Sequence, residues 1–146
     1  MGGLVQILQE LPADHPTRAF YVGIFKEMSA RLVQLQQPDG LWRSSLLDPA
    51  AYPGGETSGS GFDTYALAWG INNGLLDAKQ YQPIIAKAWS AMAKECVHPD
   101  GKLGYVQGTG KEPKDGQPVS YTSTPDFEDY GLGCFLLAGS EIYKMK

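Results

Sequence analysis

The sequence predicts an all-α domain in which helical hairpins pack side by side as an α/α toroid. Segments that are apolar on nearly all sides alternate with segments that are apolar on one side, as inner and outer helices would be. A short unit also recurs. Pro38-Asp39-Gly40 returns as Pro99-Asp100-Gly101, an offset of 61 (99 minus 38), and residues 63–68 resemble residues 128–133, with Tyr65 and Tyr130 offset by 65 (130 minus 65). Such repetition is typical of hairpin arrays.

The composition fits one domain spanning residues 1–146 and disfavours charged partners. The chain is 42% hydrophobic and 11% aromatic, enough for a core, and carries a net charge of -4. Its lysines and arginines are scattered singly, so neither nucleic acid nor an anionic membrane surface is an expected partner. No apolar run approaches the ~20 residues of a membrane span, and residue 1 onward does not resemble a signal peptide. The compartment stays open between bacterial cytoplasm and periplasm.

The side chains also argue against several kinds of chemistry. Cys96 and Cys134 lie in apolar runs, which predicts buried free thiols. The two histidines, His15 and His98, have no metal-ligand spacing, so no metal site is expected. Nucleophile-elbow, phosphate-loop and dinucleotide-binding patterns are all missing, and no cofactor is expected.

The first two helices are predicted as an inner and an outer helix. Residues 4–11 form a short apolar segment with a single charge. A turn follows in which Asp14 can cap the next helix and Pro16 can occupy its first turn. Apolar residues then recur at helical spacing up to Leu35, while charged residues take the other positions, so this second helix is amphipathic.

The third helix is predicted as the central inner helix, within residues 54–77. Residues 56–61 are polar and glycine-rich, and read as an entry loop that offers hydroxyl caps. The helix is expected to start near Phe62 and to be apolar on every side up to Ile71, with only Asp63 charged. Asn72-Asn73-Gly74 suits its end. The entry loop is expected to face whatever the domain binds.

The last two helices repeat the alternation. Pro83 is expected to open an amphipathic fourth helix that runs to Cys96. Residues 106–125 have no periodicity and read as a long loop, which inside a compact domain is usually functional or mobile. A final apolar helix is expected to open near residues 124–126. The helices near residues 4, 62 and 127 would then form the inside wall of the ring.

Four candidate binding residues lie near the expected mouth of the toroid. Trp42 follows a tight turn, where it could stack on a sugar ring or pack as a wall. Glu56, Ser58 and Ser60 lie where hydroxyls and free N–H groups could bind a carboxylate or sugar hydroxyls. Capping of the helix is the alternative role for these three.

Asp126 is a further, weaker candidate. It forms an acidic cluster with Glu128 and Asp129 at the expected start of the last helix. Acid/base catalysis needs two carboxylates that face each other across a substrate. Acids in a first helical turn more commonly complement the helix dipole.

Several segments resemble the C-terminal half of glycoside hydrolase families 105 and 88, the unsaturated rhamnogalacturonyl and glucuronyl hydrolases. They occur in the family's order over nearly all 146 residues: GLW at 40–42, ETSGSGFDTYALAWGINNGLLD at 56–77, PDGKLGYVQ at 99–107 and DFEDYGLGCFLLAGSEIY at 126–143. The resemblance implies an (α/α)6 barrel of six hairpins and no cofactor. It also implies hydration of the vinyl-ether double bond in pectin- or rhamnogalacturonan-type oligosaccharides that end in an unsaturated uronate.

The chain departs from this family pattern at its start. In the family, the catalytic aspartate and an Arg-Gly-Asn-Gly-Trp segment precede the point that resembles Met1. The resemblance therefore gives no catalytic residue here; Trp42, Glu56, Ser58, Ser60 and Asp126 are carried over as the active-site rim. The chain is expected to be about half a barrel, to be inactive alone, and to self-associate or to pair with a missing N-terminal half.

Two alternatives remain open. Gln36-Gln37-Pro38-Asp39-Gly40-Leu41-Trp42 fits the QxxxGxW turn of terpenoid cyclases, which are also α/α toroids, although DDxxD and DxDD clusters are missing. The other alternative is a non-catalytic carbohydrate-binding or assembly module, in which Trp42 and the loop at 106–125 hold a sugar without cleaving it.

Overall fold

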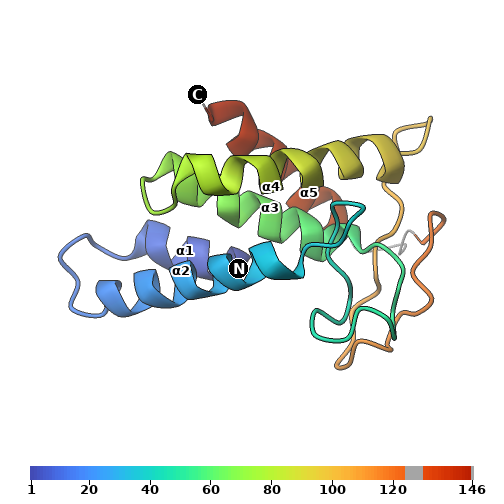
Figure 1. The fold of residues 1–146 in the computed structure, drawn as a ribbon, viewed down its shortest axis with the longest axis horizontal. Helices are drawn as coiled ribbons and strands as arrows, with labels where there is room; N and C mark the ends of the chain where they lie inside the picture. Colours follow the sequence, from blue (N-terminus) through green and yellow to red (C-terminus); the bar gives the residue numbers. More distant parts are fainter. Residues whose placement is uncertain (124–129, 146) are drawn as a thin grey trace.

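The computed structural model describes residues 1–123 and 130–145, which are helical apart from their loops (Figure 1). The helices are α1 (Gly2–Glu10), α2 (Arg18–Leu35), α3 (Thr57–Asn72), α4 (Ala78–Ala91) and α5 (Tyr130–Lys144). A π-helical turn, Met92–Cys96, extends α4 to the predicted end. In the described residues the β-structure is a single antiparallel bridge, between Val97 and Leu103. The expected opening of the last helix, near 124–126, lies outside the described residues.

The helices form an inner row and an outer pair, which confirms the predicted all-α toroid architecture. α3 contacts both α1 and α5, while α2 packs on α1 and α4 packs on α3 (Figure 1). The buried face of α3 includes a run from Thr64 to Gly70 that is buried at every position. A helix buried on all sides has to be covered on all sides, and α3 lies between its neighbours for that reason. The long loops gather at the N-terminal end of α3.

Two glycines allow α5 to approach its neighbours closely. A Cβ atom built on Gly61 of α3 would lie 2.9 Å from the Sγ atom and 3.1 Å from the carbonyl carbon of Cys134 in α5. A Cβ atom on Gly131 would lie 2.8 Å from a methyl group of Val106. These separations are shorter than ordinary contacts, so larger residues at either position would push α5 away from the rest of the core.

The other inner helices are covered on one side only. α1 buries Val5 and Leu8, and α5 buries Gly131, Cys134, Ala138 and Glu141. On their open sides, Leu132 and Leu136 of α5 are 50% and 58% exposed, and Ile7 of α1 is 40% exposed. The prediction of a surrounded inner helix therefore holds for α3 and not for α1 or α5, because each of these two has an inner-row neighbour on one side only.

The start of α2 differs from the prediction. Asp14 and Pro16 lie in the preceding turn, and the N-cap position is Thr17, whose side chain makes no capping hydrogen bond. The Thr17 hydroxyl instead lies 2.9 Å from the Nδ1 atom of His15. Arg18, at the first position of α2, donates to the carbonyl oxygens of Leu8 at 2.9 Å and Leu11 at 2.5 Å. It therefore satisfies carbonyl groups at the end of α1, which would otherwise lack helical partners.

Two other helices begin earlier than predicted. α3 starts at Thr57, so the polar glycine-rich stretch is the first part of the helix and not an entry loop. α4 starts at Ala78 after the cap Asp77, whose carboxylate accepts from the Lys79 N–H at 3.0 Å. Pro83 is thus inside α4, where the prediction placed it at the start. At the other end of α3, Gly74 has a φ of 70°, the left-handed conformation expected after a helix.

The repeated turn of the sequence is also a repeated structure. Gly40 and Gly101 have φ angles of 94° and 87°. In each copy the aspartate accepts a hydrogen bond from the N–H group two residues on: Asp39 from Leu41 at 3.0 Å, and Asp100 from Lys102 at 3.1 Å. This is the side-chain turn that aspartate favours. The two copies of the turn therefore share their conformation, which confirms this part of the predicted repeat.

The two cysteines are buried free thiols, as predicted. Burial raises the pKa of both thiols, that of Cys134 to about 12. A thiol with such a pKa is almost entirely protonated at neutral pH and is a poor nucleophile.

None of the helices in the described residues has the length and apolar character needed to span a bilayer.

Candidate functional site

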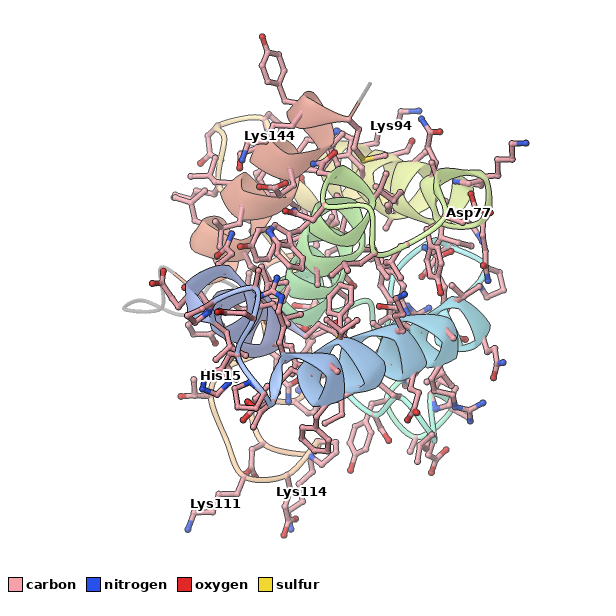
Figure 2. The ribbon with its side chains drawn as sticks, turned by 90° about the vertical axis from the view of Figure 1, so that its left-hand side faces the viewer. His15, Asp77, Lys94, Lys111, Lys114 and Lys144 are labelled. Atoms are coloured by element: carbon pink, nitrogen blue, oxygen red, sulfur yellow. The ribbon has the colours of Figure 1, made fainter. Side chains whose placement is uncertain are left out.

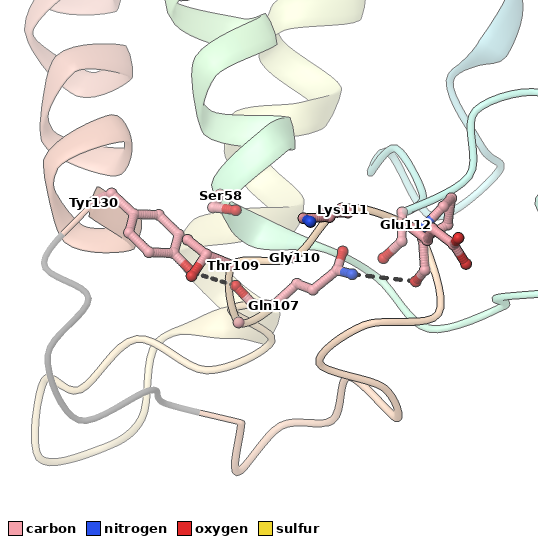
Figure 3. Close-up of a pocket in the computed structure, with 10 residues that line it drawn as sticks. Ser58, Gln107, Thr109, Gly110, Lys111, Glu112 and Tyr130 are labelled. Atoms are coloured by element: carbon pink, nitrogen blue, oxygen red, sulfur yellow. Dashed lines mark hydrogen bonds between the residues drawn. The ribbon is translucent and has the colours of Figure 1, made fainter.

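Two adjoining cavities lie at the N-terminal end of α3, and together they are called the α3 groove here. The larger, of about 380 Å³, is bounded by α3, α5 and the loop at 107–113 (Figure 3). The smaller, of about 210 Å³, lies between α3 and the loop that follows Trp42. Ser44 and Gln107 line both cavities. The groove therefore lies where the sequence predicted a binding face, at the entrance to the central inner helix.

Glu56 holds the start of α3 together. Its side chain is 6% exposed and caps the helix. One carboxylate oxygen accepts from the Ser58 N–H at 2.8 Å, the Ser58 hydroxyl at 2.5 Å and the Gln107 N–H at 3.3 Å. The other accepts from the Gly59 N–H at 2.6 Å. Four hydrogen bonds thus commit this carboxylate to the helix start and the loop. The geometry favours the capping alternative for Glu56 over direct contact with a ligand.

The first N–H groups of α3 are consequently not open to an anion. Thr57 donates its N–H to the Tyr105 carbonyl oxygen at 2.8 Å, and Ser60 donates to the Glu56 carbonyl oxygen at 3.3 Å. The N–H groups between them both go to the Glu56 side chain. The expectation that free N–H groups here bind a carboxylate is therefore wrong, because Glu56 and Tyr105 already take them up. The start of α3 therefore offers no free N–H group to an anionic ligand.

Gln107 connects the loop to both inner helices. Besides its bond to Glu56, its side-chain amide donates to the carbonyl oxygens of Asp115 at 2.5 Å and Pro113 at 3.1 Å. The backbone carbonyl oxygen of Gln107 accepts a hydrogen bond from the Tyr130 hydroxyl of α5 (Figure 3). Gln107, Ser44 and Tyr130 were not among the site residues predicted from the sequence. Their roles depend on contacts between distant segments, for which the sequence carries no local signal.

The backbone before Gln107 is in an unusual conformation. Tyr105 has a φ of 56°, in the left-handed region that residues other than glycine seldom adopt. Two hydrogen bonds hold it there: its N–H donates to Ser120 at 3.0 Å, and its carbonyl oxygen accepts from Thr57 at 2.8 Å. The Thr57 hydroxyl adds a bond to the Gly104 carbonyl oxygen at 2.8 Å. This strained residue is thus fixed against the start of α3, beside the α3 groove.

Trp42 and Ser60 pair with each other in the interior. The Trp42 side chain is 2% exposed, and its indole N–H donates to the Leu32 carbonyl oxygen at 2.9 Å. Ser60 is fully buried, and its hydroxyl oxygen accepts from the Trp42 backbone N–H at 3.0 Å. Both residues line the smaller cavity. This burial favours packing over sugar stacking for Trp42, and it makes Ser60 a support for the groove.

Ser58 is the predicted residue best placed for a ligand. It is partly exposed and lines the larger cavity, as Figure 3 shows. Its hydroxyl donates to Glu56, which leaves its oxygen able to accept from a sugar hydroxyl. Asp126, the fifth predicted site residue, lies outside the described residues.

The two cavities of the α3 groove differ in the basic residues that line them. Lys111 lines the larger cavity from the loop, projects from the body of the molecule (Figure 2), and forms no ion pair within the described part of the chain. Arg43 lines the smaller cavity but is bound to Asp39, with nitrogen–oxygen distances of 2.6 Å and 3.2 Å. Within the described residues, no cluster of three potential metal ligands occurs.

Asp63 lies at the acidic end of the groove. It is one helical turn beyond Ser60 on the same face of α3 and lines the smaller cavity. Its pKa is raised from 3.8 to about 7, mainly by burial; the amino group of residue 1 opposes this rise and the Glu56 carboxylate contributes to it. The sequence analysis noted Asp63 as the one charge on an apolar helix without assigning it a role. That isolated charge was the signal for a residue of the groove.

Comparison with solved structures finds the same arrangement of helices in a glycosyl hydrolase. A solved structure described as a glycosyl hydrolase family 88 protein from Bacteroides vulgatus aligns with a TM-score of 0.89 and 40% identity, over 99% of this chain and 41% of that one. The model for Glycosyl Hydrolase Family 88 matches residues 1–146. The chain therefore belongs to glycosyl hydrolase family 88, which confirms the resemblance found in the sequence. The terpenoid-cyclase alternative is set aside by this membership.

Two relatives carry a more specific description. Proteins described as unsaturated 3S-rhamnoglycuronyl hydrolases, from Formosa agariphila and an Alteromonas species, are 49% and 41% identical over 146 and 136 residues. The matches cover 100% and 93% of this chain. The chain spans 37% of the length of the first relative and 31% of the second.

Proposed function

We propose that this chain forms one wall of the sugar-binding groove of a glycosidase that acts on oligosaccharides ending in an unsaturated uronic acid. The family match over residues 1–146 is the observation that carries the proposal. The α3 groove supports it, because a concave site with a few polar groups at the mouth of a helical toroid suits a sugar. The catalytic aspartate of the family belongs, in this proposal, to a part of the barrel outside this chain.

The proposed reaction is hydration of the vinyl-ether double bond. A proton adds to one carbon of the C=C bond, and the hydroxyl group of water adds to the carbon that carries the ring oxygen. The resulting hemiketal opens, and the glycosidic bond to the next sugar then breaks without oxidation or reduction. The proton requires a positioned acid with a matched pKa, and the chain's contribution is to orient the sugar opposite that acid.

Within the groove, three residues have a proposed part in binding. The Ser58 oxygen is placed to accept a hydrogen bond from a sugar hydroxyl. Gln107 holds the loop against α3 and α5, which fixes the shape of the larger cavity. Lys111 supplies the positive charge that an anionic uronate needs, and its long side chain can fold over the rim. These roles add specific contacts to the active-site rim that the sequence predicted.

The isolated chain is expected to bind the sugar without turning it over. Calorimetry with an unsaturated uronate disaccharide and its saturated counterpart is expected to show about tenfold tighter binding of the unsaturated one, which corresponds to about 1.4 kcal/mol. The alkene absorbance of the unsaturated disaccharide should not decrease in the presence of the chain, because half a cleft offers neither the acid nor its enclosure.

Other outcomes would separate the alternatives. Equal affinity for both sugars would favour the non-catalytic carbohydrate-binding module. Turnover above background would contradict the placement of the catalytic group outside this chain. Failure to bind either sugar would contradict the proposed groove itself.

The open side of α5 is proposed to be covered by another helical hairpin, from a second copy or from the rest of a barrel. Exposed apolar side chains follow this face: Leu132, Leu136 and Tyr143. Exposed apolar stripes of this kind mark association surfaces. Light scattering is expected to give a mass above that of one chain, and the double change Leu132→Lys and Leu136→Lys should return the monomer. A monodisperse monomer before substitution would contradict the proposal.

A further inference from the structure

Asp63 lines the α3 groove, and no described residue pairs with its carboxyl group. It lines the smaller cavity of the α3 groove together with Glu56 and Ser60, which precede it on the same face of α3. Within the described residues its carboxyl group makes no hydrogen bond and no ion pair. Glu56, in contrast, accepts four hydrogen bonds from the protein. Asp63 is partly exposed and lines the cavity, so its carboxyl group is open to a ligand in the α3 groove.

The charged groups around Asp63 do not neutralise it. Glu56 on the same helix is a second carboxylate and adds repulsion. The amino group of residue 1, at the start of α1, attracts the charge but does not overcome the effect of burial. Arg43, which lines the same cavity from the loop, is bound to Asp39. The carboxyl group of Asp63 therefore titrates with a pKa of about 7.

We propose that Asp63 is a substrate-positioning residue of the α3 groove, whose neutral carboxyl group donates a hydrogen bond to an oxygen atom of the anionic sugar. This inference rests on the proposed function. A carboxylate at this position would repel a uronate in a groove of low dielectric, whereas a carboxylic acid can donate to it. A carboxyl group kept neutral near pH 7 by an apolar site so that it donates a hydrogen bond has precedent in enzymes.

The proposal predicts that binding takes up a proton. At pH 6 most Asp63 side chains are already protonated, and the anionic sugar binds without a change in charge. At pH 8 the carboxyl group must first gain a proton, and with a pKa of about 7 this lowers the affinity about tenfold. Calorimetry at pH 8 in two buffers of different ionisation enthalpy is expected to report close to one proton taken up per disaccharide bound.

Two variants separate contact from structure. Asp63→Asn keeps a donor and cannot ionise, so it should bind the unsaturated disaccharide equally at pH 6 and pH 8, with no proton uptake. Asp63→Ala lacks the donor and should bind about tenfold more weakly than Asp63→Asn at both pH values. Asp14→Asn is the control, because it removes an exposed carboxylate from the α1–α2 turn at the opposite end of the molecule (Figure 1). It should behave like the unchanged chain. Circular dichroism checks that each variant is folded.

The outcomes are distinguishable. Absence of proton uptake in the unchanged chain, or equal binding by Asp63→Asn and Asp63→Ala, would overturn the role of Asp63 while leaving the proposed function in place. In that case the carboxyl group would serve a part of the barrel outside this chain. Absence of binding to the unchanged chain at both pH values would overturn the proposed function as well.

Discussion

Replacing Glu56 with alanine is expected to destabilise the chain by about 3 kcal/mol. The change removes a cap that satisfies two N–H groups of α3, a loss that costs about 1 kcal/mol by itself. It also leaves the N–H group of Gln107 without its acceptor at a partly buried position, which costs about 1–3 kcal/mol more. Urea unfolding followed by circular dichroism measures the difference in the free energy of unfolding.

The comparison with Asp77→Ala makes this test specific. Asp77 caps α4 through one N–H group, that of Lys79, at an exposed position, so its loss should cost about 1 kcal/mol or less. Glu56→Gln keeps an acceptor but turns an amide donor toward other donors, and it should fall between the unchanged chain and Glu56→Ala. If Glu56→Ala cost no more than Asp77→Ala, Glu56 would be an ordinary cap. Its link to the loop would then contribute nothing to stability.

Replacing Trp42 with alanine is expected to cost about 3–5 kcal/mol, the largest effect of a single substitution proposed for this chain. The side chain is 2% exposed and lies among buried residues of α2 and α3, so its removal would leave a cavity. Trp42→Phe keeps most of the apolar volume and loses the indole donor, so it should cost about 1–2 kcal/mol. The Leu32 carbonyl oxygen keeps a second donor, the Gln36 N–H at 3.1 Å.

Trp89 offers a matched control for the loss of an indole ring. It stacks on Phe135 with a ring-centroid distance of 4.8 Å but is only partly buried, so Trp89→Ala should cost less than Trp42→Ala. Calorimetric titration of Trp42→Phe with the unsaturated disaccharide completes the test. A large loss of affinity with little loss of stability would restore the sugar-stacking role for Trp42.

The sequence predicted the helices well because their patterns are local. Alternating one-sided and all-round apolar segments identified the helices, and the Pro-Asp-Gly turns marked the ends of two of them. Helix starts were harder. α3 is capped by a glutamate, which is not a preferred cap residue, and α4 contains Pro83 in its interior, where proline usually signals a start. Both starts depend on particular hydrogen bonds that composition does not reveal.

The α3 groove lies near the residues predicted to bind, but the contacts of these residues were not predicted. Residues 56–60 lie beside the groove as expected, yet three of the predicted residues support it from within, because Trp42 and Ser60 bond to each other and Glu56 bonds to the helix and loop. The contact between Gln107 and Glu56 joins residues 51 positions apart. No periodicity or short motif reports such a distance. The ionisable group most altered by burial among these residues, Asp63, was visible in the sequence only as an unexplained charge.

The two Pro-Asp-Gly turns have the same backbone conformation but differ in the space around their glycines. At Gly40 an added Cβ atom would lie 2.8 Å from the Lys87 carbonyl oxygen, so both the φ angle and a neighbouring helix require glycine. At Gly101 nothing lies within 4 Å, and only the φ angle matters. Asparagine and aspartate tolerate that angle better than other side chains. The first turn is therefore tied to glycine, whereas the second should tolerate asparagine or aspartate.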